Sequence, residues 1–515
     1  MPALHLSDTD PAELPVDAIV VGLYATNGGT GGSAPLLAPG AESVAVAFEG
    51  RLAETFALLG ATGGAGEVTK LASLGTVCAP VIAAVGLGPV PGDAGIPTET
   101  LRRATAAAVR ALAGSAKVAV ALPSPDDHDG QDGQETIRAI AEGALLGTYR
   151  FPGYKTKPQP SRRDPVKSVT LHVADAADRT AKAEVKRAAI VTAAVTRTRD
   201  WVNTAPNELR PPGFAAQIAQ AAADAGLGVE VLDEKGLRKA GYGGILAVGM
   251  GSEAPPRLVT ISYAPRGATR SVALVGKGIT FDTGGYAVKP AQGMWEMKAD
   301  MSGAAAITSV VIALAALKPK VRVTAYVPIA ENMISGSSYR PGDVVTMYGG
   351  KRVEVLNPDA EGRMILADAM VRAQEDAPDY LLETSTLTGG QVIALGKRVA
   401  GVMGDERLCE RIRAVGDRVG EPAWPMPIPD EVRKGMDSDV ADISQTNAGM
   451  DRAGHMLQGG AFLREFVEDG LAWAHIDIAG PAYHAGEPTG HWSKGGTGVP
   501  VRLLLALIDD IAAHG

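Results

Sequence analysis

The chain has 515 residues and a mass of 52.9 kDa, which is too large for one ordinary hydrophobic core, so two domains are expected. Its content of 46% hydrophobic and 21% charged residues is typical of a folded globular protein and excludes a disordered chain. The net charge of −9 disfavours a broad nucleic-acid-binding surface, and two cysteines are too few for a disulfide framework.

The start of the chain does not resemble a secretion signal. Its first eight residues contain no basic segment followed by an apolar core, and no purely apolar run of about 18 residues occurs later. We therefore expect a cytoplasmic protein without a membrane-spanning segment.

The first part of the chain alternates short apolar runs with Ala-rich segments. Strands are predicted at residues 17–22, 81–85, 117–121 and 168–173, and a helix at residues 98–113. This alternation predicts an α/β sandwich. A glycine-rich run at residues 28–33 lacks the Gly-Lys-Ser/Thr ending of a phosphate-binding loop and is interpreted as a surface loop.

The middle of the chain contains the predicted domain boundary. Residues 152–165 are rich in Pro, Lys and Arg without an apolar period, which predicts a loop. Residues 178–203 are expected to form a long helix that joins the two domains. We place an amino-terminal α/β domain at residues 1–185, with a role in oligomerisation or regulation, and a catalytic domain at residues 186–515.

The second part again alternates strands with helices. The predicted strands are residues 258–263, 271–275, 321–327, 353–356, 381–384 and 472–478, and the predicted helices are residues 304–317, 364–375 and 461–468. This pattern favours a larger carboxy-terminal domain with a mixed sheet covered by helices on both faces. Ligands of such folds bind at the carboxyl ends of the strands.

Charged residues gather at these strand and helix ends between positions 277 and 363. The acids are Asp282, Asp300, Asp359 and Glu361, and the bases are Lys277, Lys289 and Arg363. Oxygen-rich ligands without Cys or His suit Mg²⁺ or Mn²⁺, and Zn²⁺ and Co²⁺ also accept them. Four carboxylates in one pocket repel one another unless cations neutralise them, so the cluster predicts a two-metal hydrolytic site.

The spacing of these residues resembles that of the leucine aminopeptidase family, the two-metal cytosolic aminopeptidases. Further similar segments occur at residues 198–203, 386–389, 438–442, 476–480 and 495–498, so the resemblance extends through most of the second half. The chain departs from the family pattern at Tyr286, Pro358 and Gly390, none of which is a predicted ligand. The proline fixes its own backbone in a loop that must present both the side chain and the carbonyl group of Asp359.

The resemblance implies an aminopeptidase that releases leucine and other bulky apolar residues from the amino terminus of short peptides. One metal ion would be held by Lys277, Asp282, Asp300 and Glu361, and the other by Asp282, Asp359 and Glu361. Lys289 would polarise the peptide carbonyl group, and a bicarbonate ion beside Arg363 would act as general base. The substrate-binding residues would be Met297, Thr386, Leu387 and Gly389. The family also implies a homohexamer.

Two other classes of function have weaker support. A two-metal phosphoesterase would use similar acids but usually also recruits histidine. A binding protein without activity would be expected to have lost at least one of the metal-ligating residues, and none is missing here. His475, His484 and His491 match no metal-ligand spacing and are interpreted as structural. The basic residues within 155–167 are interpreted as a solvated loop, so neither nucleic acid nor a membrane is expected as a partner.

Overall fold

The computed structural model describes residues 1–26, 34–92, 95–123, 131–157 and 163–515. The glycine-rich run at residues 28–33 and part of the loop at residues 152–165 lie outside this description. The chain divides into two compact units: unit 1 comprises Met1–Ala193 and Gly486–Lys494, and unit 2 comprises Ala194–Ala485 and Gly495–Gly515. The passage from unit 1 to unit 2 falls inside the long helix α5 (Arg179–Asn203).

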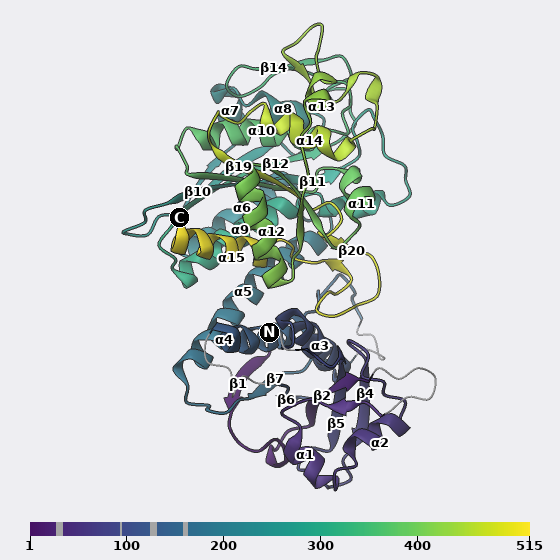
Figure 1. Cartoon of the computed structure of the whole chain (residues 1–515). Helices are drawn as coiled ribbons and strands as arrows, with labels where there is room; N and C mark the ends of the chain where they lie inside the picture. Colours follow the sequence, from purple (N-terminus) through teal and green to yellow (C-terminus); the bar gives the residue numbers. More distant parts are fainter. Residues whose placement is uncertain (27–33, 93–94, 124–130, 158–162) are drawn as a thin grey trace. The chain divides into compact units, whose positions relative to one another are not determined.

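Unit 1 is the predicted α/β sandwich. Its mostly parallel sheet has the strand order β1-β7-β6-β2-β5-β4, with β3 paired to β2. Side chains of β2 (Ala18–Ala25) alternate between two hydrophobic cores, with Ala18 and Val20 in one and Ile19 and Val21 in the other. Helices α3 and α4 cover one face of the sheet, and α1 and α2 the other (Figure 1). The other bounds are β1 (Ala3–Ser7), β3 (Leu36–Leu37), α1 (Glu42–Ala47), α2 (Leu52–Leu58), β4 (Val68–Ala72), β5 (Val81–Pro89), α3 (Thr98–Ala111), β6 (Lys117–Ala121), α4 (Gln131–Gly147) and β7 (Ser168–His172).

Unit 2 contains the predicted mixed sheet. The strand order is β17-β16-β19-β15-β10-β12-β9-β8, with β11 paired to β12. The central pairs β10–β12, β10–β15 and β15–β19 are parallel, whereas β8–β9, β9–β12 and β16–β19 are antiparallel. The strands are β8 (Gly228–Leu232), β9 (Arg257–Tyr263), β10 (Ser271–Gly276), β11 (Gly278–Asp282), β12 (Arg322–Asn332), β15 (Tyr380–Ser385), β16 (Ala400–Gly404), β17 (Ala423–Pro425) and β19 (Ala472–Asp477). Two small sheets contain β13 (Val344–Thr346), β14 (Arg352–Glu354), β18 (Ile443–Ser444), β20 (Tyr483–His484) and β21 (Gly495–Gly496).

Helices cover both faces of this sheet (Figure 1). One face carries α6 (Pro211–Asp224), α9 (Ser302–Leu317), α12 (Glu406–Val419) and α15 (Val501–His514). The other carries α7 (Glu234–Ala240), α8 (Gly243–Gly249), α10 (Glu361–Gln374), α13 (Asp430–Lys434) and α14 (His455–Arg464). Short helices α11 (Gly389–Leu395), η2 (Met294–Ala299) and η3 (Ala448–Met450) lie in connections, as does η1 (Pro11–Glu13) of unit 1.

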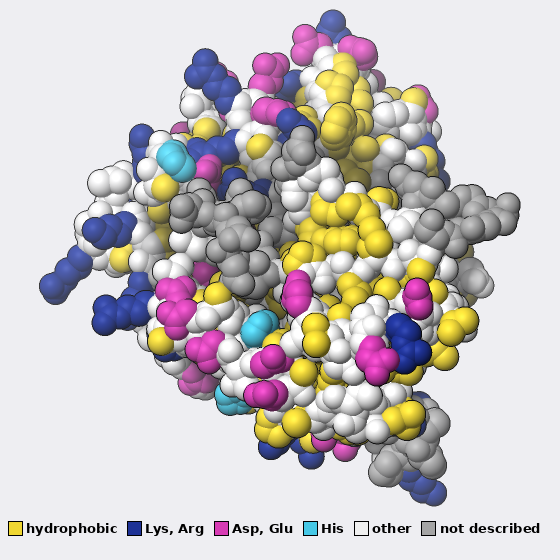
Figure 2. All heavy atoms as spheres, turned by 60° about the horizontal axis from the view of Figure 1, so that its bottom comes forward, with side chains coloured by type: hydrophobic (Ala, Val, Ile, Leu, Met, Phe, Trp, Pro, Cys, Tyr) yellow, Lys and Arg dark blue, Asp and Glu magenta, His cyan; other side chains and the backbone are white. Residues whose placement is uncertain are grey.

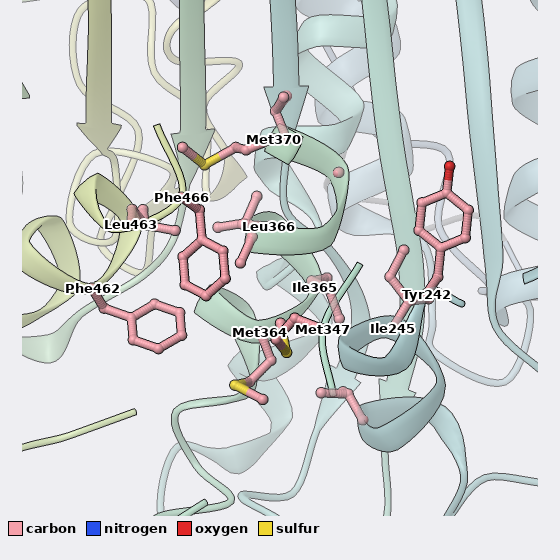
Figure 3. Close-up of a cluster of buried hydrophobic side chains, with 14 of the residues drawn as sticks. Tyr242, Ile245, Met347, Met364, Ile365, Leu366, Met370, Phe462, Leu463 and Phe466 are labelled. Carbon is pink, nitrogen blue, oxygen red and sulfur yellow. The ribbon is translucent and has the colours of Figure 1, made fainter. Parts of the chain in front are cut away.

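The core of unit 2 fixes α10 and α14 relative to each other. Figure 3 shows Met364, Ile365, Leu366 and Met370 of α10 in one buried cluster with Phe462 and Leu463 of α14, Ile245 of α8 and nearby Met347, Tyr242 and Phe466. Full burial of such a side chain contributes about 1.5–3 kcal/mol. The amino ends of both helices are therefore held firmly where they reach the candidate site.

Several predicted elements differ from the observed ones in their bounds. The strand predicted at residues 321–327 is longer, because β12 spans Arg322–Asn332. The helix predicted at residues 461–468 begins earlier, because α14 spans His455–Arg464 and includes Gly459 and Gly460. A Cβ added to Gly459 would lie 2.8 Å from Leu387 Cδ2, so close packing requires glycine at a position where helix propensity argues against it. The strand predicted at residues 353–356 is shorter, since β14 ends at Glu354.

The surface combines charged and apolar side chains. Figure 2 shows one face of the molecule, on which apolar side chains lie between acidic and basic ones. Leu58, Leu74 and Ile393 are among the exposed large hydrophobic residues. The helical segment Met294–Leu317 is long and apolar enough to cross a membrane by length and composition alone. However, 83% of its apolar stretch is buried inside the structure, as in the core helix of a globular unit.

Candidate metal centre and its cavity

Lys277 lies between β10 and β11, where two glycines let neighbouring backbone come close. A Cβ on Gly276 or Gly278 would lie 2.7 or 2.4 Å from a backbone carbonyl oxygen. The Lys277 amide donates to the carbonyl oxygen of Thr384 at 3.1 Å, which ties it to the carboxyl end of β15. Its side chain passes Gly362, where an added Cβ would lie 2.4 Å from Lys277 Cε. Glycines from two separate motifs thus make room for one lysine.

The Lys277 ammonium group is buried between two carboxylates. Its Nζ lies 2.8 Å from Oδ1 of Asp300 and 2.8 Å from Oε1 of Glu361, and it donates to the carbonyl oxygen of Thr386 at 3.1 Å. Glu361 is the first residue of α10, where the helix favours a negative charge. Burial alone would lower the pKa of Lys277, but Asp300 and Glu361 outweigh this effect and raise it. Lys277 is therefore a charged partner of the two acids in this structure.

Lys289 forms a second group of the same kind. Its Nζ lies 2.7 Å from Oδ2 of Asp282 and also contacts Oδ1 of Asp359. Asp282 is the last residue of β11, and its Oδ1 accepts a hydrogen bond from the side-chain amide of Asn332 at 2.8 Å. The Lys289 side chain is 22% exposed, compared with 4% for Lys277, so Lys289 can be reached by a ligand.

The donor atoms of the cluster fit divalent cations. One carboxylate oxygen from each of Asp282, Asp359 and Glu361 lies within 4.8 Å of the others. Oδ2 of Asp300 and Oε2 of Glu361 are buried and accept no hydrogen bond from any described residue, although buried carboxylate oxygens normally have a partner. Burial and the neighbouring acids together raise the pKa of Asp300, which shows how unfavourable the assembled negative charge is. Cations would relieve this repulsion.

Arg363 is a buried cation with spare hydrogen-bonding capacity. Its Nη1 donates to the carbonyl oxygen of Gln445 at 2.5 Å, and its Cζ lies 5.8 Å from the centre of the Phe462 ring. Its Nε has no hydrogen-bond partner among the described residues. Burial lowers the pKa of Arg363 to about 10, although Glu361 and Asp477 favour its charged form. A charged guanidinium group with an unused donor fits a small anion as its ligand.

One cavity of about 730 Å³ brings the sequence-predicted residues together. Its lining includes all of them: Lys277, Asp282, Lys289, Met297, Asp300, Asp359, Glu361, Arg363, Thr386, Leu387 and Gly389. The predicted substrate-binding residues Met297, Thr386, Leu387 and Gly389 form what we call the substrate wall. The Thr386 hydroxyl donates to Oδ1 of Asp300 at 2.7 Å, which connects this wall to the acid cluster. The cavity is also lined by residues that the sequence analysis did not name, among them Lys397, Arg452 and His455.

Sequence reasoning missed two residues that position the loop before Asp359. The Asn332 amide donates to the carbonyl oxygen of Pro358 at 3.0 Å, and the buried Tyr339 hydroxyl donates to the same oxygen at 2.7 Å. Asn332 ends β12, so the rule that ligands gather at the carboxyl ends of strands could have found it. Tyr339 lies in a connection and has no such signal.

Asp477 fixes the segment that forms the predicted substrate wall. Its Oδ1 accepts hydrogen bonds from the backbone amides of Leu387 and Ala479, each at 3.2 Å, and its Oδ2 accepts one from the Thr388 hydroxyl at 2.7 Å. Asp477 is fully buried at the end of β19. Asp477 lies within one of the family-like segments, residues 476–480, but its sequence position alone predicts no role for it.

Most of the chain matches known proteins. Residues 196–505 match the catalytic domain of the cytosol aminopeptidase family, and residues 20–158 match its N-terminal domain. A probable cytosol aminopeptidase of Streptomyces griseus is 48% identical over 100% of this chain and 99% of its own length, and one of Mycobacterium leprae is 47% identical over 89% and 86%.

Solved structures agree with these matches. A tomato leucine aminopeptidase mutant is 28% identical with a TM-score of 0.85, and the match covers 99% of this chain and 97% of that one. The bottromycin maturation enzyme BotP in complex with Mn is 34% identical with a TM-score of 0.82, covering 96% and 100%. The resemblance predicted from the sequence motifs is confirmed.

Proposed function

Because the chain belongs to the cytosol aminopeptidase family, we propose that it is a metal-dependent aminopeptidase of the cytoplasm that releases leucine and other bulky apolar residues from short peptides. The observation that carries this proposal is the convergence of the acids, the two lysines and the expected substrate wall in one cavity. A peptide bound there would meet carboxylates, cations and an apolar surface at the same time.

We assign two divalent ions to the acid cluster, Mn²⁺ or Zn²⁺ with Mg²⁺ or Co²⁺ as substitutes, which when bound supply an activated water molecule and a Lewis acid. The residues that would hold them are Lys277, Asp282, Asp300, Asp359 and Glu361. Lys277 must be neutral to act as a ligand, so its Nζ must give up the proton that Asp300 and Glu361 stabilise in the structure.

Lys289 and Arg363 would act on the reacting groups. The Lys289 ammonium is partly exposed beside Asp282 and Asp359, where it can stabilise negative charge that develops on the peptide carbonyl oxygen. Arg363, with its unused Nε, would hold bicarbonate, and this anion would accept a proton as general base. Neither lysine nor arginine forms a covalent bond with the substrate in this scheme.

Two features of the cavity support the proposed preference for the amino end of a peptide and for apolar side chains. A free α-amine in its neutral form could be a nitrogen ligand of one of the two assigned ions, whereas an acylated amine could not, so the centre favours the amino end of a peptide. Met297 lines the same cavity as Thr386, Leu387 and Gly389. Because a thioether adapts its shape, this wall suits bulky apolar side chains such as leucine.

Matched substrates test this function. Leucyl di- and tripeptides with a free amine should be hydrolysed, whereas their N-acetylated forms should not, because acetylation removes the basic amine. A phosphate ester provides the comparison with a two-metal phosphoesterase and should remain intact. Equal rates on free and acetylated peptides, or cleavage of the phosphate ester alone, would overturn the proposal.

A further inference from the structure

The cavity contains a cation that the acid cluster does not use. Arg452, in the connection between η3 and α14, lines the same cavity as the acids. Its side chain is exposed, and no described residue forms a hydrogen bond or ion pair with its guanidinium group. The other arginine and the two lysines discussed above, by contrast, contact a carbonyl oxygen or carboxylates. Arg452 is therefore available to a ligand inside the cavity.

The backbone that carries Arg452 is held in place. The buried side-chain amide of Gln458 donates to the carbonyl oxygens of Asp451 and Ala453 at 2.8 and 3.0 Å, one on each side of Arg452. The Asp451 carboxylate accepts the Ala453 amide at 3.0 Å and so caps its own turn. A cation on a backbone fixed in this way loses less freedom when it binds a ligand than one on an unanchored loop.

Arg363 lies close to the same part of the cavity wall as Arg452, and the carboxylate of Asp451 also lines the cavity. Burial lowers the pKa of His455 to about 4, and the charges of Arg363 and Arg452 add to this effect. His455 is therefore neutral at pH 7 and adds no positive charge to this part of the cavity wall. The carboxylates of the metal centre are contributed by other elements, namely the end of β11, the segment before α9 and the start of α10.

We propose that Arg452 binds the free α-carboxylate of a di- or tripeptide whose amino end lies in the acid cluster. A short peptide carries an amine at one end and a negative carboxylate at the other, and the cavity offers the assigned metal centre to the first and the guanidinium group of Arg452 to the second. The cavity thereby selects short zwitterionic peptides over peptide amides and long chains. This inference rests on the proposed aminopeptidase activity and specifies its substrate class.

The test compares leucylglycine with leucylglycinamide, which differ only in the terminal charge. Wild-type protein and Arg452→Gln are assayed on both substrates in low-salt buffer. The variant should lose about tenfold in kcat/KM on leucylglycine, mainly through KM, because a hydrogen bond to a charged group is lost. Its kcat/KM on leucylglycinamide should change little. Arg452→Lys should restore part of the loss, and added salt should reduce the difference between the two substrates.

Lys397→Gln is the matched control. It removes another exposed positive charge from the cavity lining, on the segment that packs against Gly480 and not on the segment that carries Arg452. It should leave the ratio of the two kcat/KM values unchanged. Equal losses on both substrates in Arg452→Gln, no loss on either, or the same selective loss in Lys397→Gln would overturn the assignment. If wild-type protein cleaves neither substrate, the proposed function itself fails.

Discussion

The two lysines of the centre have the same charge but different surroundings, and this separates their expected roles. Lys277 is almost completely buried between Asp300 and Glu361, as befits a side chain that becomes a metal ligand. Lys289 remains partly open to the cavity while it contacts Asp282 and Asp359. Only Lys289 can both neutralise the acids and meet a substrate carbonyl oxygen.

Replacing Lys289 tests this separation. A positioned cation at a developing oxyanion contributes roughly 3–4 kcal/mol, so Lys289→Ala should lower kcat by about 10² to 10³ with little change in KM. Its metal content should stay close to that of the wild type, because its side chain is not an assigned ligand. Steady-state kinetics with elemental analysis provides the measurement. A variant with both metal ions and near-normal kcat would refute the electrophilic role.

Gly362 provides a steric test of the Lys277 position. In Gly362→Ala the new methyl group would lie 2.4 Å from Lys277 Cε, so the lysine must move away from Asp300 and Glu361. Since a displacement of about 1 Å at a reacting centre can cost 10²-fold, kcat/KM should fall by about that factor. Gly213→Ala is the control, because its Cβ would meet no atom closer than 4.0 Å and it lies in α6. Similar activities of both variants would contradict this account.

Among the secondary-structure elements, parallel strands and helix ends decide where the site forms. β10, β11, β12 and β15 deliver their carboxyl ends to the cavity, and α10 and α14 hold it from the other side through their shared core. β15 and β19 add a buried charged pair behind it, because Glu383 and His475 are register partners whose side chains contact each other. Neither side chain is exposed.

This pair predicts a pH dependence of stability. Burial alone would lower the pKa of His475, but Glu383 outweighs it and raises the pKa above the usual value near 6.5. The stabilisation is therefore fully present below about pH 6.5 and is lost as pH rises through the raised pKa. In Glu383→Gln the histidine is buried without its partner acid, so its pKa should fall below 6.5; stability should then increase as pH rises towards about 6.5 and stay level above that value. Denaturation midpoints at a series of pH values would check this, and identical pH profiles would contradict it.

The sequence predicts elements well where pattern and function coincide. Two features of the site can be recognised in the sequence itself: the apolar strand before Lys277 and the Asp-Ala-Glu-Gly-Arg motif at the start of a helix. The site residues could therefore be predicted from the sequence. Tyr339 and Arg452 could not be found this way, because long-range folding alone brings them to the site. Asn332 was missed because the predicted strand stopped at residue 327, short of the end of β12. The early start of α14 was missed because its glycines serve tight packing and not helix formation.

For the whole molecule, the two units and their surfaces raise the question of assembly. Leu58 and Leu74 of unit 1 and Ile393 of unit 2 are 89%, 93% and 85% exposed. Single exposed apolar side chains are common on protein surfaces and do not identify an interface by themselves, so the expected assembly rests on the family resemblance. The homohexamer expected from that resemblance would supply contacts between chains.

Mass in solution tests the assembly. Light scattering on the purified chain should give about six times the chain mass of 52.9 kDa. Replacing Leu58 and Leu74 together by serine should shift the distribution towards smaller species if these side chains lie in contacts. A wild-type mass equal to that of one chain would rule the hexamer out.

The central claim is that the acid cluster acts through bound divalent ions. The most direct measurement is hydrolysis of a leucyl peptide by the wild-type protein before chelation, after chelation and after addition of Mn²⁺, with metal content determined in parallel. We predict that activity disappears with the metal and returns as about two ions per chain are bound again, and that Asp282→Asn and Glu361→Gln bind fewer ions. Full turnover by metal-free protein would contradict the account.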